Sequence, residues 1–282
     1  MNFFTKTFLI LSLIFLFSCK SNKEVSKPEI KNEDINILMI EAYKEGLIEL
    51  ENGYALLAAK KFNEAEILYP QSIWAPRSSL MAAYSYYSQD YYEDSINELI
   101  RFFKTYPKNI RTDYARYLLA MNYYEQIINE KKDLGPILEA KNNFIIIKEN
   151  FPNSDFALDA EYKLNLIEEM LASKEMYLAK YYSDKEKWIP AINRYKSVLK
   201  NYSTTIFVEE ALHRLVEIHY RIGLKDESKK YASMLGYNYQ SSEWYEKSYK
   251  IFNKDYIKES IKKDKKNKKT TLDKIKSLLS LK

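Results

Sequence analysis

The feature that most constrains this chain is a recurring pair of residues, a small one followed four places later by a large one. In helical repeats of the tetratricopeptide type, the small residue lets two antiparallel helices approach closely, and the large residue wedges between neighbouring units. Five such pairs occur, so the pattern predicts about five units. The units are degenerate because the distance between successive pairs varies. The pairs are Ala58 with Phe62, Ser95 with Leu99, Ala140 with Phe144, Ala191 with Tyr195, and Ser228 with Ala232.

Two further patterns locate the helices of these units. A proline follows each of the first three pairs, at Pro70, Pro107 and Pro152, and a helix should end there because the residue before proline disfavours the α conformation. Ahead of each pair lies a residue suited to close packing on the preceding helix. These residues are Gly46, Ala83, Ala120, Ala179 and Val216.

The sequence predicts an all-α fold. Only 5 Gly and 7 Pro among 282 residues leave few turns for β-hairpins and favour helices joined by short connections. We therefore expect residues 37–252 to form about five tetratricopeptide repeats, stacked as a right-handed superhelical solenoid. From Ser154 to Lys185 the apolar residues keep helical spacing without Gly or Pro, which predicts one long helix with Ser154 as its N-cap.

The N-terminal segment is typical of an export signal. An apolar run from Phe8 to Phe17 is short for a membrane span but suits the core of a signal peptide, so we expect residues 1–18 to be removed. Leu16 to Cys19 resemble a bacterial lipobox, which implies lipidation of Cys19, with palmitate among the acyl chains; the alternative is an incidental thiol in a plain secretory signal. Lys20, where Asp is absent, resembles lipoproteins sent to the outer membrane.

The two polar ends of the mature chain are predicted to lie outside the repeats. Residues 19–36 are rich in Lys, Ser, Asn and Glu and form the expected flexible tether. Residues 253–282 hold 11 Lys against four acidic residues, 11 − 4 = +7, whereas the whole chain carries +5. The basic charge therefore belongs to a tail, and it gives no reason to expect nucleic-acid binding by the folded part.

With the repeats in register, residues 37–252 resemble the BamD family of outer-membrane assembly lipoproteins, also called YfiO or ComL. The lysine-rich tail lies outside this resemblance, which rests on several short motifs. They are Tyr-Pro-Gln-Ser-Ile-Trp-Ala at 69–75, Ala-Tyr-Ser-Tyr-Tyr at 83–87, Tyr-Tyr-Glu-Gln-Ile at 123–127, Ala-Ile-Asn-Arg-Tyr at 191–195, Glu-Ala-Leu-His-Arg-Leu-Val-Glu at 210–217 and Leu-Gly-Tyr-Asn-Tyr at 235–239.

The resemblance implies a function without chemistry. It implies a lipid-anchored scaffold subunit of the β-barrel assembly machinery, on the periplasmic face of the outer membrane, that helps barrel proteins to insert and fold. Its implied partners are a barrel-forming BamA-like subunit, accessory lipoproteins and unfolded outer-membrane proteins. An alternative in another class is a tetratricopeptide lipoprotein that coordinates cell-wall or envelope proteins.

Repeat stacks present a concave surface, lined by the first helix of each unit, on which a peptide can bind. The inward-facing places of tetratricopeptide proteins, carried over to this chain, predict an aromatic peptide groove with one cation that could meet a client's C-terminal carboxylate. The alternative is that these tyrosines are ordinary packing residues. The predicted groove residues are Tyr43, Arg77, Tyr84, Tyr87, Tyr114, Tyr117 and Tyr124, with Leu47, Leu80 and Met121 between them.

The last two units are predicted to have a charged inner face. The resemblance places partner docking in this half of the chain, with Glu217 and Arg221 as the docking residues, and the alternative is that these are solvated helix charges. The whole charged set is Lys180, Asp184, Glu210, His213, Glu217 and Arg221.

Nothing in the sequence favours an enzyme. His213 and His219 are too far apart in sequence for a helical metal pair and are predicted to be structural. Cys19 is the single cysteine, so a cysteine-based zinc site is excluded. Nucleotide-binding and hydrolase motifs are absent, and the sequence therefore predicts no catalytic residue, no metal and no cofactor.

Overall fold

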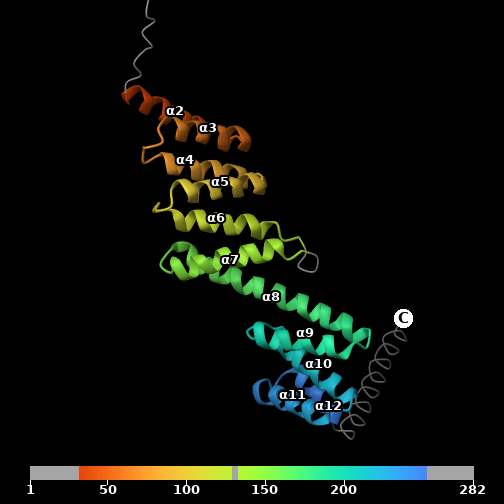
Figure 1. Ribbon diagram of the computed structural model, residues 1–282. Helices are drawn as coiled ribbons and strands as arrows, with labels where there is room; N and C mark the ends of the chain where they lie inside the picture. The colour runs from red at the N-terminus through yellow and green to blue at the C-terminus, as the bar shows by residue number, and fades with distance from the viewer. Residues whose placement is uncertain (1–31, 129–132, 253–282) are drawn as a thin grey trace, which may run out of the picture.

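The computed structural model describes residues 32–128 and 133–252 of the chain (Figure 1). The signal segment, Cys19, most of the predicted tether and the lysine-rich tail lie outside these residues. The helices are α2 (Asn32–Glu51), α3 (Ala55–Leu68), α4 (Ala75–Tyr87), α5 (Tyr92–Thr105), α6 (Thr112–Glu125), α7 (Gly135–Asn150), α8 (Asp155–Asp184), α9 (Trp188–Asn201), α10 (Phe207–Arg221), α11 (Lys225–Asn238) and α12 (Glu243–Phe252).

The helices stack in one elongated array, with α2 at one end and α11 and α12 at the other (Figure 1). Helices α2 to α11 pack chiefly against their neighbours in sequence, whereas α12 packs mainly against α10. The buried side chains accordingly form four separate clusters along the array rather than one central core. This is the quasi-one-dimensional packing of a repeat protein, and the prediction of an all-α helical-repeat fold is confirmed.

The small and large residues of the repeat pattern lie where the helices touch. Phe62, Leu99 and Phe144 are completely buried, as are the small residues that begin their pairs. In the last unit the Ser228 hydroxyl also donates a hydrogen bond of 2.8 Å to the Val216 carbonyl on the preceding helix. The sequence pattern therefore identified the contacts that hold each helix pair together.

The closest approach is at Gly46 of α2, which lies against the ring of Phe62. A Cβ atom at position 46 would stand 2.8 Å from the Phe62 ring, and that ring has no space to move because it is fully buried. Replacing Gly46 by Ala should therefore lower the free energy of unfolding by about 1–2 kcal/mol, despite alanine's higher helix propensity. Chemical denaturation followed by far-UV circular dichroism measures the change.

A second variant tests the cause of this destabilisation. In the Gly46→Ala background, Phe62→Leu should cost less stability than it does alone, because the smaller side chain relieves the clash. Equal costs in the two backgrounds would show that the ring contact is not responsible.

The predicted helix ends are confirmed at all three prolines. Helices α3, α5 and α7 end two residues before Pro70, Pro107 and Pro152. The residue that precedes each proline has a non-helical backbone, with ψ between 49° and 76°. The steric restriction before proline favours these three ends, although α9 and α11 end with a similar backbone geometry before Ser203 and Gln240.

The long helix is confirmed as α8, which begins after Ser154. The Ser154 hydroxyl accepts a hydrogen bond from the Phe156 amide and also donates one of 2.7 Å to Asp113 at the start of α6. Its cap therefore holds α8 onto α6 as well as starting the helix. At the other end of the chain, α2 begins at Asn32, inside the predicted tether of residues 19–36, with Asp34 in its first turn, where an acidic side chain is favourable.

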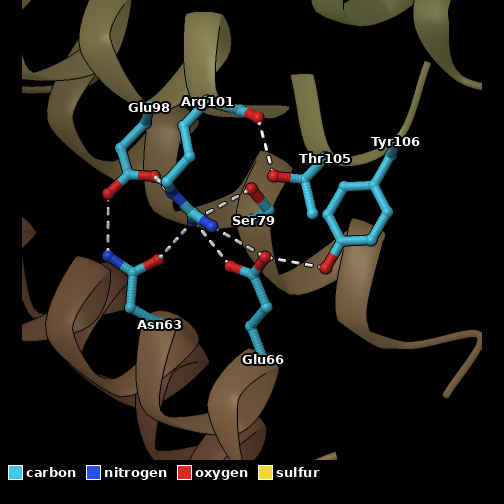
Figure 2. Close-up of polar contacts among 7 residues, drawn as sticks. All are labelled: Asn63, Glu66, Ser79, Glu98, Arg101, Thr105 and Tyr106. Atoms are coloured by element: carbon cyan, nitrogen blue, oxygen red, sulfur yellow. Dashed lines mark hydrogen bonds and ion pairs between the residues drawn. The ribbon is translucent and has the colours of Figure 1, made fainter. Parts of the chain in front are cut away.

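A cluster of polar side chains joins the first two helix pairs (Figure 2). Arg101 of α5 donates to both Glu66 oxygens, at 2.8 and 2.6 Å, and Tyr106 donates to Glu66 at 2.7 Å. Arg101 also contacts Glu98, Asn63 and Ser79. Glu66 is a buried carboxylate whose charge is balanced by one guanidinium, so the cluster fixes α3, α4 and α5 relative to one another.

Candidate functional site

Five of the predicted groove tyrosines lie together on α4 and α6, and we call this set the tyrosine wall. Tyr84 and Tyr87 stand on α4, with ring centroids 6.5 Å apart. Tyr114, Tyr117 and Tyr124 stand on α6, and Tyr114 is close enough to both α4 tyrosines for their hydroxyls to affect its pKa. Tyr84 remains 38% exposed, whereas the other four are half-buried.

Helix α8 completes the wall with residues that the sequence analysis did not select. The Phe156 ring stacks on Tyr117 with centroids 4.9 Å apart, and Asp159 accepts a hydrogen bond of 2.7 Å from the Tyr117 hydroxyl. One turn further, the Lys163 ammonium lies 4.3 Å from the Tyr124 ring centroid. These α8 residues share one helix face, so extending the inward-facing register past Ser154 would have found them.

Four hydroxyls of the wall remain protonated at neutral pH, because burial raises the pKa of Tyr87, Tyr114, Tyr117 and Tyr124. Burial, followed by the nearby Tyr84 and Tyr87, raises the pKa of Tyr114 to about 12. Burial and the neighbouring Glu125 likewise raise the pKa of Tyr87. Each hydroxyl can therefore donate a hydrogen bond while its ring offers apolar surface, which suits an extended peptide better than a reacting group.

The structure does not place Tyr43 on the wall. Its side chain is only 6% exposed, because it packs between Phe62 and Trp74 with ring centroids 5.2 Å from each. The close approach of α2 to α3 draws this ring into the core. Arg77 does remain exposed, with its guanidinium carbon 5.0 Å from the Trp74 ring centroid. A cation is therefore available near the start of α4.

The charged residues of the last units line a cleft of about 510 Å³ between α8, α9 and α10. We call it the docking cleft. Five of the six predicted residues line it, and His213 is the exception. Aromatic side chains share the cleft, and the Arg221 guanidinium carbon lies 5.5 Å from the Trp188 ring centroid. The five charged residues are Lys180, Asp184, Glu210, Glu217 and Arg221.

Arg214, which the sequence analysis missed, organises one side of the cleft. It pairs with Glu210 at 3.1 Å and with Glu217 at 2.8 Å. Burial opposes ionisation of Glu217, but hydrogen bonds and charges from His213 and Arg214 outweigh it and lower the pKa of Glu217 to about 2. Glu217 therefore stays ionised, and its stabilising contribution is lost only as the pH falls toward that value.

Both histidines have structural partners, as predicted. His213 is buried, with Nδ1 2.8 Å from the Ser248 hydroxyl on α12. His219 is also buried, with Nδ1 2.7 Å from the Leu215 carbonyl one turn earlier. In residues 32–128 and 133–252, no three His, Cys, Asp or Glu side chains gather as a metal site would require, and no helix is long and apolar enough to span a membrane.

Comparison with known proteins gives a consistent set of matches. A sequence model of the family YfiO, described as outer membrane lipoprotein, matches residues 36–235. The outer membrane protein assembly factor BamD of Rickettsia prowazekii is 37% identical over 243 residues, which cover 86% of this chain and 94% of that protein. BamD of Caulobacter vibrioides is 32% identical over 238 residues, covering 84% of this chain and 77% of the relative.

Proposed function

Because this chain belongs to the YfiO family of outer membrane lipoproteins, it is an outer membrane protein assembly factor, and we propose that it works as a non-catalytic scaffold subunit of the β-barrel assembly machinery. The observation that supports this proposal is that the tyrosine wall and the docking cleft are separate surfaces on one solenoid. The tyrosine wall lies near the middle of the array and the docking cleft lies toward its C-terminal end. Two surfaces let one chain hold a client and a partner at once.

The tyrosine wall is the proposed binding surface for unfolded outer-membrane proteins. Its rings offer apolar area with few rotatable bonds, so an extended segment can be held at a modest cost in ordering. Arg77 stands beyond one end, and Lys163 stands over Tyr124 at the other. Barrel precursors end in an aromatic residue with a free carboxylate, and these cations provide charged groups that can receive it.

The docking cleft is the proposed site for the barrel-forming, BamA-like subunit, and accessory lipoproteins are further proposed partners. Arg221 lies over Trp188, and within residues 32–128 and 133–252 its N–H groups make no ion pair, so they can face a partner. Glu217 remains charged next to it within the same cleft. Charges arranged in this way favour a specific orientation of the docked subunit.

We further propose that lipidation at Cys19 anchors the scaffold to the periplasmic face of the outer membrane, after removal of residues 1–18. Twelve residues lie between Cys19 and the start of α2 at Asn32. Fully extended, the chain from Cys19 to Asn32 spans about 45 Å. The tether therefore allows the solenoid to stand off the membrane surface, and residues 253–282 are proposed to form a separate basic tail.

A double substitution tests the client surface. Tyr87→Ala with Tyr124→Ala should weaken binding of a synthetic barrel C-terminal peptide by roughly 10- to 100-fold, because each removes a ring from the wall. Fluorescence anisotropy of a labelled peptide measures the affinity. Two exposed tyrosines away from the wall, Tyr54 and Tyr237, provide the matched control when both are replaced by Ala. Unchanged affinity of the wall variant, with its helical content intact, would reject this surface.

A further inference from the structure

The arginines of residues 32–128 and 133–252 include two contrasting groups. Arg101, Arg194 and Arg214 each pair with at least one carboxylate. Arg77, Arg116 and Arg221 lie over aromatic rings, as Arg214 also does, but none of these three has a carboxylate within ion-pair distance in the part of the chain that the structure describes. Arg116 differs from the other two because its guanidinium is partly withdrawn from solvent.

Arg116 projects from α6 into the space between α5 and α7. Its guanidinium carbon lies 4.1 Å from the Phe103 ring centroid on α5, and Nη1 donates a hydrogen bond of 3.2 Å to the Asn143 side-chain oxygen on α7. Its Nε atom is covered and has no hydrogen-bond partner among the described residues. Burial lowers the pKa of Arg116, as expected for a cation without a compensating charge.

The preceding unit shows what is missing around Arg116. When the repeats are aligned on Ala58, Ser95 and Ala140, Phe103 takes the place of Glu66, and Asn143 takes the place of Glu98. Arg116 takes the place of Ser79 when the preceding helices are aligned on Ala83 and Ala120. These three counterparts belong to the cluster in Figure 2, where two carboxylates surround Arg101.

The first two interfaces between units therefore each hold a guanidinium, but only the first of them supplies carboxylates to it. At the second interface, an aromatic ring and an amide stand at the two carboxylate positions. The Phe103 ring lies against the Arg116 guanidinium, and the Asn143 amide is a neutral acceptor that leaves the positive charge uncompensated.

We propose that Arg116, Phe103 and Asn143 form a receptor for an acidic side chain. This side chain belongs to a segment of an assembly partner that lies along α5 and α7. A carboxylate would complete the cluster as Glu66 does in the unit before, with charge-assisted hydrogen bonds to the guanidinium. Arginines held in partly desolvated, aromatic-lined positions are frequent hot spots of protein interfaces. This receptor goes beyond the proposed function, because it involves neither the tyrosine wall nor the docking cleft.

The first test supplies the carboxylate from within the chain. Phe103→Glu should leave the melting temperature nearly unchanged, because the new side chain can pair with Arg116. In an Arg116→Met background, the same substitution should lower it by at least about 5 °C, because the carboxylate is then partly buried without a cation. An equal shift in both backgrounds would overturn the proposed receptor.

The second test identifies the occupant in the assembled complex. Ile100 is 53% exposed and stands at the repeat position of Asn63, beside the receptor, so a photo-crosslinking residue is placed there in the full-length chain. We expect a crosslink to a partner segment that contains Asp or Glu. Arg116→Met and Phe103→Glu should each lower the crosslink yield at least about tenfold, since truncating one member of a desolvated charge pair weakens binding to that extent.

Replacing the crosslinked acid by its amide should reproduce the loss. A yield unaffected by Arg116→Met, or a crosslinked segment without an acidic residue, would overturn the proposal. If excess inorganic phosphate abolishes the crosslink and no acidic segment is found, the site binds a free anion. That result would also overturn the proposal. None of these outcomes bears on the tyrosine wall or the docking cleft. Failure of the receptor is therefore distinguishable from failure of the proposed function.

Discussion

Replacing Arg101 by Met should lower the free energy of unfolding by about 3 kcal/mol, because it leaves a carboxylate buried without its cation. The Glu66 side chain is only 7% exposed, and both of its oxygens bond to Arg101. Tyr106 would remain as a single neutral donor to Glu66, which cannot balance the charge. Urea denaturation followed by far-UV circular dichroism measures the loss.

A double substitution separates charge from packing in this cluster. In Arg101→Met with Glu66→Gln, the unpaired charge is gone. About half of the unfolding free energy lost in Arg101→Met alone should therefore return. The matched control is Arg194→Met, which breaks a pair whose carboxylate, Glu175, lies nearer the surface. Losses below about 1 kcal/mol for Arg101→Met would mean that solvent screens Glu66 and that the cluster does not hold α3 to α5.

The second large effect concerns membrane attachment. Cys19→Ser should move nearly all of the protein from the membrane fraction to the soluble periplasmic fraction, because several acyl chains together give stable anchoring and a chain without them has no such anchor. Fractionation followed by immunoblotting measures the distribution, and mass spectrometry of the mature N-terminus measures lipidation.

Ser18→Ala is the matched control for this change, because it keeps a small residue before the cysteine and should leave attachment intact. A salt wash removes protein that is retained only through partner subunits. Cys19→Ser protein that stays in washed membranes would contradict the anchor.

The sequence predicted the repeat fold well because its signals are local. Gly46, Pro70 and Ser154 each impose a steric or hydrogen-bonding constraint on their own helix, and each acts as expected in the structure. The start of α2 was less well predicted, because the polar residues before Asn36 read equally well as a tether or as the first turn of a helix.

The candidate site was only partly predictable, because helical periodicity gives the face of a residue but not its depth. Tyr43 has an inward-facing register position, yet the close contact at Gly46 turns its ring into the core. The cluster of Arg101 with Glu66 joins residues one repeat apart, and Arg116 contacts residues of two different units. Such contacts depend on how the units pack, which the sequence pattern does not specify.

The proposed link between client and partner on one solenoid is tested most directly by purification of the lipidated, tagged chain from solubilised membranes. We expect the wild-type chain to bring down a barrel-forming subunit, and Arg221→Glu to lose most of it through charge reversal in the docking cleft. Arg111→Glu, an exposed substitution at the start of α6, should retain it. Recovery of no barrel-forming subunit, or equal recovery with Arg221→Glu, would contradict the account.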